Sequence, residues 1–84
     1  MLTYAIKETA MRIANASDFG AAVRKRRKEL GYTQAELAGY CGCSTVYLSN
    51  LENGKETSEI GKALFVAGRL GLDLVALKRT GETL

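Results

Sequence analysis

Hydrophobic residues recur at helical spacing in four stretches of this chain, and turn residues separate the stretches. The first stretch carries Phe19, Ala22, Val23 and Leu30 on one side of a helix. Glycines follow the stretches and predict where helices end, because glycine readily adopts the left-handed backbone of a helix C-terminus. The expected helices cover residues 17–30, 34–41, 44–53 and 57–70.

Polar residues that can cap a helix stand at the start of each stretch. Thr33 is followed three residues later by Glu36, which is the pattern of a capping box. Such residues accept hydrogen bonds from backbone amides that have no partner inside the helix. The expected N-caps are Ser17, Thr33, Ser44 and either Thr57 or Ser58.

The second and third helices are expected to be short and held at a sharp angle by a tight turn. Ala38 stands where the two helices would cross, and Gly42 supplies the left-handed turn four residues later. Leu48 and Leu51 then form the inner face of the third helix. This spacing of a small residue, a glycine and paired apolar residues is typical of a helix-turn-helix.

The pattern changes after Gly71, where the segment Leu72–Lys78 is apolar on both faces and predicts a short strand. A strand needs hydrogen-bond partners for its backbone. Two partners are possible: the alternating segment Leu2–Lys7, or the same strand of a second copy about a two-fold axis. The residues expected to pair in this dimer strand are Leu72, Leu74, Val75, Ala76 and Leu77.

The predicted fold is therefore mainly α, with four to five helices and a short C-terminal strand. Residues 1–16 form an N-terminal extension, either a strand or irregular. Residues 17–71 form the helix-turn-helix domain, and residues 72–84 form the dimerisation strand and tail.

Composition limits the possible functions mainly through the residue types that are scarce. With no His and two Cys in 84 residues, the chain is poorly supplied for nucleophilic catalysis or metal binding, and we expect neither an enzyme nor a cofactor. The net charge of +3 permits nucleic-acid binding. No apolar run approaches the roughly 20 residues that a membrane span needs. The two Cys flank Gly42 without zinc-site spacing, so we expect small half-buried thiols in a reducing cytoplasm.

Five consecutive cations at residues 24–28 cannot all face the same partner, because successive helical residues turn by about 100°. Arg27 falls on the apolar stripe, four residues after Val23, and should point inward. A buried cation requires a carboxylate, and Glu52 on the third helix is the expected partner. Arg24, Lys25 and Lys28 face outward, either into solvent or toward phosphates, and Arg26 is ambiguous.

Two sequence blocks carry a family resemblance. Gly31–Ala38 (GYTQAELA), with Gly42, and Leu48–Lys55 (LSNLENGK) resemble the lambda-repressor-like helix-turn-helix domain of the Xre and Cro type, over roughly residues 17–71. Cys43 departs from the Val or Ile usual in that family. Val46 and Tyr47 stand where many relatives have longer polar groups, so no operator preference is carried over.

A fourth helix followed by a Leu-rich strand is similar to HipB-like antitoxins. In that subgroup the terminal strand pairs across a two-fold axis, and the protein represses its own operon. The resemblance implies a homodimer on an inverted repeat of double-stranded DNA and, less directly, a HipA-like serine/threonine kinase toxin as partner.

The same resemblance places the start and outer face of the third helix in the major groove of DNA. The expected base contacts are Ser44, Thr45, Val46, Ser49 and Asn50, with Val46 suited to a thymine methyl group. The expected phosphate contacts are Gln34, Tyr47, Asn53, Lys55 and Arg24. Tyr47 is alternatively only a packed side chain, while Ser44 and Asn53 are expected to act both as helix caps and as contacts.

The leading hypothesis is thus an autoregulatory, sequence-specific repressor, the antitoxin of a type II toxin–antitoxin pair. One alternative is a stand-alone Xre-type repressor. The other is a helix-turn-helix scaffold that acts only in protein–protein interaction.

Overall fold

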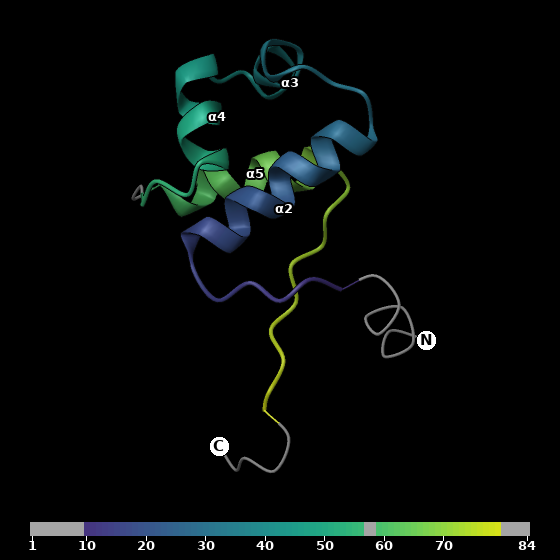
Figure 1. Ribbon diagram of the computed structural model, residues 1–84, viewed down its shortest axis with the longest axis vertical. Coiled ribbons are helices and arrows are strands. Elements are labelled where there is room, and N and C mark those ends of the chain that lie inside the picture. The colour runs from purple at the N-terminus through teal and green to yellow at the C-terminus, as the bar shows by residue number, and fades with distance from the viewer. Residues whose placement is uncertain (1–9, 57–58, 80–84) are drawn as a thin grey trace.

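Four helices make up the folded body in the computed structural model, which describes residues 10–56 and 59–79. They are α2 (Ala16–Glu29), α3 (Gln34–Cys41), α4 (Thr45–Glu52) and α5 (Ile60–Arg69). In Figure 1, α2 and α5 run across the middle of the view, with α4 at the left and α3 above. The mainly helical architecture predicted from hydrophobic spacing is confirmed.

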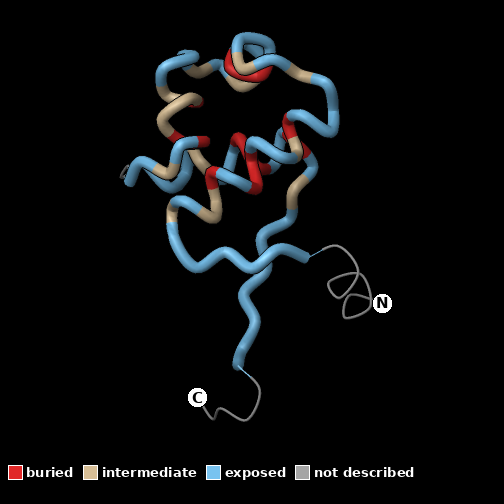
Figure 2. The backbone as a smooth tube through the Cα atoms, in the orientation of Figure 1, coloured by how far each residue is buried: buried red, intermediate tan, exposed pale blue. Residues whose placement is uncertain are grey.

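The core lies between the inward faces of all four helices, as the buried segments in Figure 2 show. Five side chains are completely or almost completely buried, and they come from every helix or its C-cap: Val23, Leu37, Leu48, Val66 and Leu70. Burying a side chain of this type contributes about 1.5–3 kcal/mol. The small core consequently depends on each helix contributing its apolar face.

Glycine at position 20 lets α2 and α4 approach closely. A Cβ atom placed on Gly20 would lie only 2.2 Å from the carbonyl oxygen of Leu51 and 2.7 Å from that of Glu52. Any larger residue would push the two helices apart. Arg27, seven residues further along the same helix, pairs with Glu52 at the end of α4.

The predicted boundaries of α3 and of the turn after it are confirmed. The Thr33 hydroxyl accepts a hydrogen bond from the Glu36 amide at 3.0 Å, and the Glu36 carboxylate accepts one from the Thr33 amide at 2.9 Å. Gly42 is left-handed, with φ of 71°. Ser44 caps α4 by accepting from the Tyr47 amide at 3.0 Å.

The predicted cap of the first helix is wrong by two residues. Asn15, not Ser17, is the N-cap: its backbone is extended, and its side-chain oxygen accepts from the Asp18 amide at 2.8 Å. Ser17 already lies inside the first turn, where its backbone is helical and it cannot serve as the cap.

The start of α5 also differs from the prediction. Glu59 occupies the N-cap position of α5 and makes no side-chain capping bond. Thr57 and Ser58, the two expected caps, lie outside the described residues.

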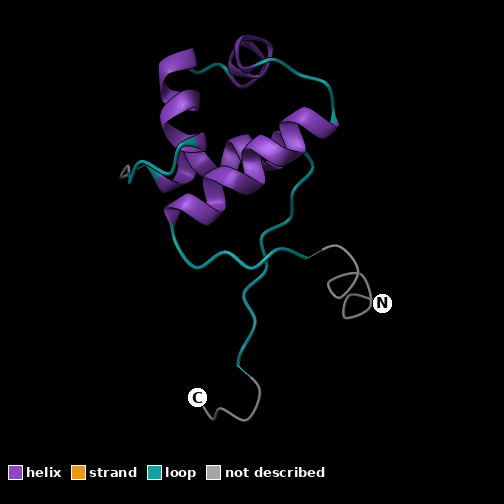
Figure 3. Cartoon of the chain, viewed as in Figure 1, coloured by secondary structure: helices purple, strands orange, loops and turns teal. Residues whose placement is uncertain are grey.

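The expected C-terminal strand is not formed within the described part of the chain. Leu72 packs against the core and donates its amide to the Ala67 carbonyl at 2.9 Å. Residues 73–79 are exposed and run away from the helical body as an extended segment without regular structure (Figure 3). A strand exists only through pairing. Of the two expected pairing partners, the N-terminal segment Leu2–Lys7 lies outside the described residues. The other partner, the same segment of a second copy, lies outside a structure of one chain.

None of the helices described is both long and apolar enough to span a membrane.

Candidate nucleic-acid interface

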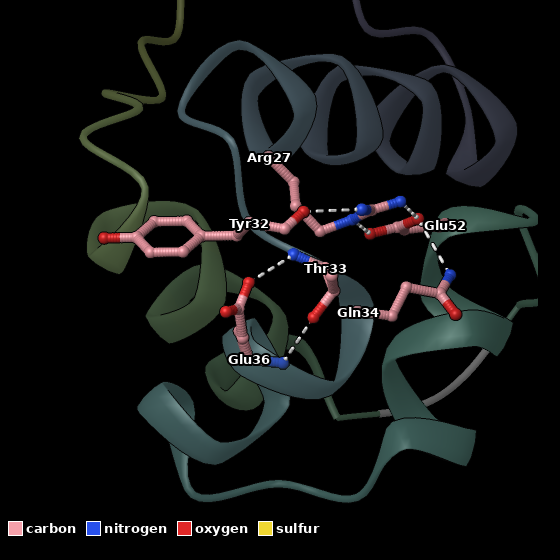
Figure 4. A network of polar contacts seen from close by, with 6 residues as sticks. All are labelled: Arg27, Tyr32, Thr33, Gln34, Glu36 and Glu52. Atoms are coloured by element: carbon pink, nitrogen blue, oxygen red, sulfur yellow. Dashed lines mark hydrogen bonds and ion pairs between the residues drawn. The ribbon is translucent and has the colours of Figure 1, made fainter.

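A buried ion pair joins α2 to α4 (Figure 4). Arg27 Nε lies 2.6 Å from Glu52 Oε2, and Arg27 Nη2 lies 2.9 Å from Glu52 Oε1. The residues are only 8% and 6% exposed. The pair expected from the apolar stripe of α2 is therefore present, and its geometry is bidentate.

Two further contacts complete this polar network. Arg27 Nη1 donates to the Tyr32 carbonyl oxygen at 2.8 Å, and Gln34 Nε2 donates to Glu52 Oε1 at 3.0 Å. The network thereby links α2, the loop before α3, the first residue of α3 and the last residue of α4. The role of Arg27 and Glu52 is structural, because both charged groups are buried and paired with each other.

Opposing effects act on the pKa of the Glu52 carboxyl. Burial acts to raise this pKa, but the hydrogen bonds from Arg27 and Gln34 and the positive charges of Arg27 and Arg24 hold it below its ordinary value. The hydrogen bond to Glu52 raises the pKa of Arg27 despite burial. Both groups are accordingly charged near neutral pH.

Gln34, an expected phosphate contact, has a role that sequence spacing did not reveal. One N–H of its side-chain amide is committed to Glu52. The amide carries a second N–H, and the bond to Glu52 fixes where the side chain lies.

The outer face of α4 carries the expected base-contacting residues. Ser44, Thr45 and Val46 are exposed at its beginning, and Ser49 and Asn50 are half-buried further along. Val46 is 71% exposed, whereas Leu48 and Leu51 on the opposite face are buried. The helix therefore presents a surface of short polar groups and one branched apolar side chain.

Tyr47 does not fit the expected phosphate contact. Its hydroxyl is buried and has no hydrogen-bond partner among residues 10–56 and 59–79, and burial raises the pKa of this phenol. Its ring lies 4.7 Å from Lys62 Nζ, in a cation–π contact with α5. Of the two alternatives for Tyr47, the packed side chain agrees with the structure, because a buried hydroxyl cannot reach a phosphate.

Polar and cationic side chains flank α4. Asn53 and Lys55 are exposed just after it, and the Lys55 amide donates to the Asn50 carbonyl at 3.0 Å. Arg24 is exposed on α2, close enough to Glu52 to help lower its pKa. Arg26, ambiguous from spacing, donates from Nε to the Leu70 carbonyl at 2.9 Å, so it caps the end of α5.

Cys41 and Cys43 are both free and half-buried beside Gly42. Burial raises the pKa of the Cys41 thiol, an effect opposite to thiolate activation. Across residues 10–56 and 59–79, no cluster of three His, Cys, Asp or Glu residues is placed to hold a metal ion.

Two interactions of α5 were missed by the sequence reasoning. Lys62 and Arg69 each lie over an aromatic ring contributed by another helix, at 4.7 and 4.3 Å from the ring centroids. The only available signal was their position on the polar side of α5, which does not reveal the neighbouring ring.

A capped recognition helix held across its partner by a short glycine turn defines the class of helix-turn-helix DNA-binding proteins. The Helix-turn-helix family model matches residues 23–77. The chain belongs to this family and is a DNA-binding transcriptional regulator of the helix-turn-helix type.

Two curated relatives match this chain. The uncharacterized HTH-type transcriptional regulator y4mF of Sinorhizobium fredii is 45% identical over 69 residues, covering 80% of this chain and 91% of the relative. The ImmF control region 10 kDa protein of Bacillus phage phi105 is 38% identical over 61 residues, covering 73% of this chain and 68% of that protein.

Solved HipB structures share the fold. A HipB–O2 20mer complex matches with a TM-score of 0.75 at 24% identity, over 83% of this chain and 97% of the HipB chain. A HipA–HipB–O2–O3 complex matches with a TM-score of 0.72 at 24% identity, over 81% of this chain and 96% of the matched chain.

Proposed function

We propose that this chain is a homodimeric, sequence-specific repressor that binds an inverted-repeat operator and represses its own operon. The observation that supports this most directly is the outer face of α4, where Thr45 and Val46 are exposed beside the cap residue Ser44. A valine that is 71% exposed on a rigid helix is poorly placed in water but well suited to a thymine methyl group.

In this proposal, Ser44, Thr45, Val46, Ser49 and Asn50 contact base edges. Short hydroxyl and amide groups at these positions can donate to and accept from bases in the major groove. Gln34, Asn53, Lys55 and Arg24 contact phosphates on either side of the helix. Ser44, as a base contact, and Asn53, as a phosphate contact, combine these roles with their positions at the two ends of α4.

The dimer is proposed to form through residues 72–78. Leu74, Val75 and Leu77 are exposed on an extended segment that leaves the body of the domain (Figure 1). Pairing with the same segment of a second copy would cover these side chains and satisfy the backbone. The two recognition helices of a dimer must then lie about 34 Å apart to enter successive major grooves on one face of the duplex.

The proposal extends to an antitoxin role with a HipA-like serine/threonine kinase as toxin. It draws support from the fold shared with HipB chains, one of them solved together with HipA. The other candidate is a stand-alone repressor, which the similarity to the regulator y4mF and to a phage control-region protein favours.

Titration of a duplex taken from upstream of the protein's own gene tests DNA binding. A scrambled duplex of equal length and composition is the control. Arg24 and Lys55 give about four cationic phosphate contacts per dimer, so the slope of log affinity against log salt should be roughly −3 to −4. Equal affinity for both duplexes would leave only non-specific binding, and no binding to either would favour the scaffold alternative.

Co-expression with the neighbouring reading frame tests the antitoxin role separately. A kinase whose toxicity is relieved by this chain, and which co-purifies with it, is the expected result. If the neighbouring reading frame encodes a protein that is neither a kinase nor toxic, the stand-alone repressor is the remaining candidate.

A further inference from the structure

An exposed cluster of aromatic rings and one guanidinium lies where the ends of α3 and α5 meet. The Arg69 guanidinium carbon lies 4.3 Å from the centroid of the Tyr40 ring and 5.9 Å from that of Phe65. The rings of Tyr40 and Tyr32 are 5.8 Å apart and tilted by 33°. We call Tyr32, Tyr40, Phe65 and Arg69 the Tyr40–Arg69 surface.

This surface is open rather than part of the core. Tyr40 and Phe65 are each 53% exposed, and Arg69 is also exposed. Grouped exposed aromatics are uncommon on a monomer surface and mark interaction sites. Tyr, Phe and Arg are also the side chains enriched at protein interfaces.

Within the described residues, Arg69 is held in place by aromatic rings but has no anionic partner. Stacking on a ring occupies the flat face of a guanidinium and leaves its in-plane N–H donors available. Arg26 and Arg27 each pair with a carboxylate, Glu29 and Glu52. In the part of the chain that the structure describes, no carboxylate forms such a pair with Arg69. The surface therefore offers a preorganised fork of donors suited to a carboxylate between two apolar rings.

The location separates this surface from the proposed DNA interface. Lys62, early in α5, contacts Tyr47 of α4, whereas Arg69 lies seven residues further, about 10 Å along the helix. Figure 4 shows the Tyr32 ring extending away from the side of the ion pair where Gln34 lies. In Figure 1, α5 ends on the side of the molecule opposite α4.

The charge pattern also argues against a phosphate backbone as the occupant. A track for DNA phosphates requires several cations along its length. A single stacked arginine beside apolar rings matches a localised carboxylate better.

We infer that the Tyr40–Arg69 surface docks a protein partner that presents an apolar or aromatic side chain beside an Asp or Glu carboxylate. The apolar group packs on Tyr40 and Phe65, and the carboxylate accepts from the Arg69 guanidinium. This docking does not depend on the operator or on the dimer segment, and it leaves α4 free.

Selection of a random twelve-residue peptide library on the full-length protein tests this inference. The expected result is enrichment of peptides with Asp or Glu next to a large apolar residue. Synthetic copies of the enriched peptides are then titrated against the wild type, Arg69→Gln and Phe65→Ala. Each substitution should weaken binding by about tenfold or more, the scale of a central interface residue.

Lys25→Gln is the matched control, because it removes an exposed cation from α2 without touching the rings. It should bind the peptides as the wild type does. Thermal unfolding monitored by circular dichroism verifies that all variants fold.

Three results would overturn the inference. The first is failure of the peptide experiment, in which either the selection shows no acidic–apolar motif or its peptides bind Arg69→Gln as well as the wild type. Another is a uniform loss of affinity for all duplexes on Arg69→Gln, which would make Arg69 a phosphate contact. The third is a monomeric Phe65→Ala variant in analytical ultracentrifugation, which would assign the surface to a second copy of this chain.

Discussion

At the scale of single residues, the Arg27–Glu52 pair explains why a cation occupies the apolar stripe of α2. The carboxylate receives two hydrogen bonds from Arg27 and one from Gln34, so desolvation is offset by direct pairing. Gln34 is a proposed phosphate contact, and the same carboxylate holds it. The network thus connects the stability of the domain to the geometry of its DNA-binding surface.

Removing one side of this pair should be costly. Glu52→Ala leaves a buried guanidinium without its anion and should lower the free energy of unfolding by about 3–5 kcal/mol, measured by urea denaturation. The control is Glu29→Ala, which removes the exposed partner of Arg26 at 3.4 Å. That exposed pair should be worth less than about 1 kcal/mol. Equal losses of unfolding free energy in the two variants would mean that the buried pair contributes no more to stability than the exposed pair.

The pKa of Glu52 predicts how stability depends on pH. Because the folded-state pKa is depressed below 4.5, the pair stabilises the fold fully above that value, and the contribution is lost as pH falls through the depressed pKa. Urea denaturation of the wild type and Glu52→Gln at several pH values measures this. The difference in unfolding free energy between the wild type and Glu52→Gln should be constant near neutral pH. It should become smaller below about pH 4.5. A difference unchanged down to strong acid would contradict the assignment.

Tyr47→Phe separates a packed side chain from a phosphate contact. The hydroxyl is buried and has no partner in the described part of the chain, so its removal should leave stability unchanged or raise it by about 1 kcal/mol. Operator affinity, measured by fluorescence anisotropy, should not change. A clear loss of affinity for all duplexes would restore Tyr47 as a phosphate contact.

At the scale of elements, α4 combines two roles on opposite faces. Leu48 and Leu51 anchor it in the core, and Gly20 lets α2 pack directly on its last turn. Such firm anchoring limits the freedom of the outer face. A helix held in this way can present short side chains such as Thr45 to base edges without needing long, flexible ones.

Substitutions on and beside α4 should affect DNA binding in two different ways. Thr45→Ala or Asn50→Ala should lower operator affinity by about 1–3 kcal/mol while leaving binding to a scrambled duplex nearly unchanged. Lys55→Ala should weaken binding to both duplexes and flatten the salt slope by about one unit per protomer. If operator discrimination survives the first two changes, α4 is not the helix that reads the sequence.

At the scale of the whole molecule, the described chain ends in a segment that the four-helix body does not cover. Leu74, Val75 and Leu77 are large apolar residues with substantial exposure, and Leu74 also lines an apolar groove with Phe19 and Leu64. The domain therefore has continuous apolar surface on the side where the segment leaves it. Such a surface fits a protein that acts as a dimer.

Deleting residues 72–84 should produce a monomer with much weaker operator binding, because only one recognition helix then engages each duplex. Analytical ultracentrifugation measures the mass, and anisotropy measures the affinity. Leu77→Asp, in the full-length chain, is the companion variant, since it places a charge in the proposed interface without shortening the protein. A truncated protein that remains dimeric would place the interface elsewhere.

Local sequence patterns were sufficient for most helix boundaries and for one tertiary contact. Thr33 with Glu36, Gly42 and Ser44 act over a few residues, so their spacing alone determined the ends of α3 and the start of α4. Arg27 was predictable because a cation on an apolar stripe must meet a carboxylate, and Glu52 lies at the end of the facing helix. These features follow from chain geometry and from the high free energy of an unpaired buried charge.

Tertiary structure decided the features that depend on neighbours distant in sequence. The burial of the Tyr47 hydroxyl, the contact of Arg26 with the Leu70 carbonyl and the stacking of Arg69 on Tyr40 all require the packing of separate helices. The strand expected at residues 72–78 is a related case: its apolar composition is local, but strand structure needs a paired backbone. Hydrophobic spacing determines which residues leave water, and only the assembled fold determines which groups they meet there.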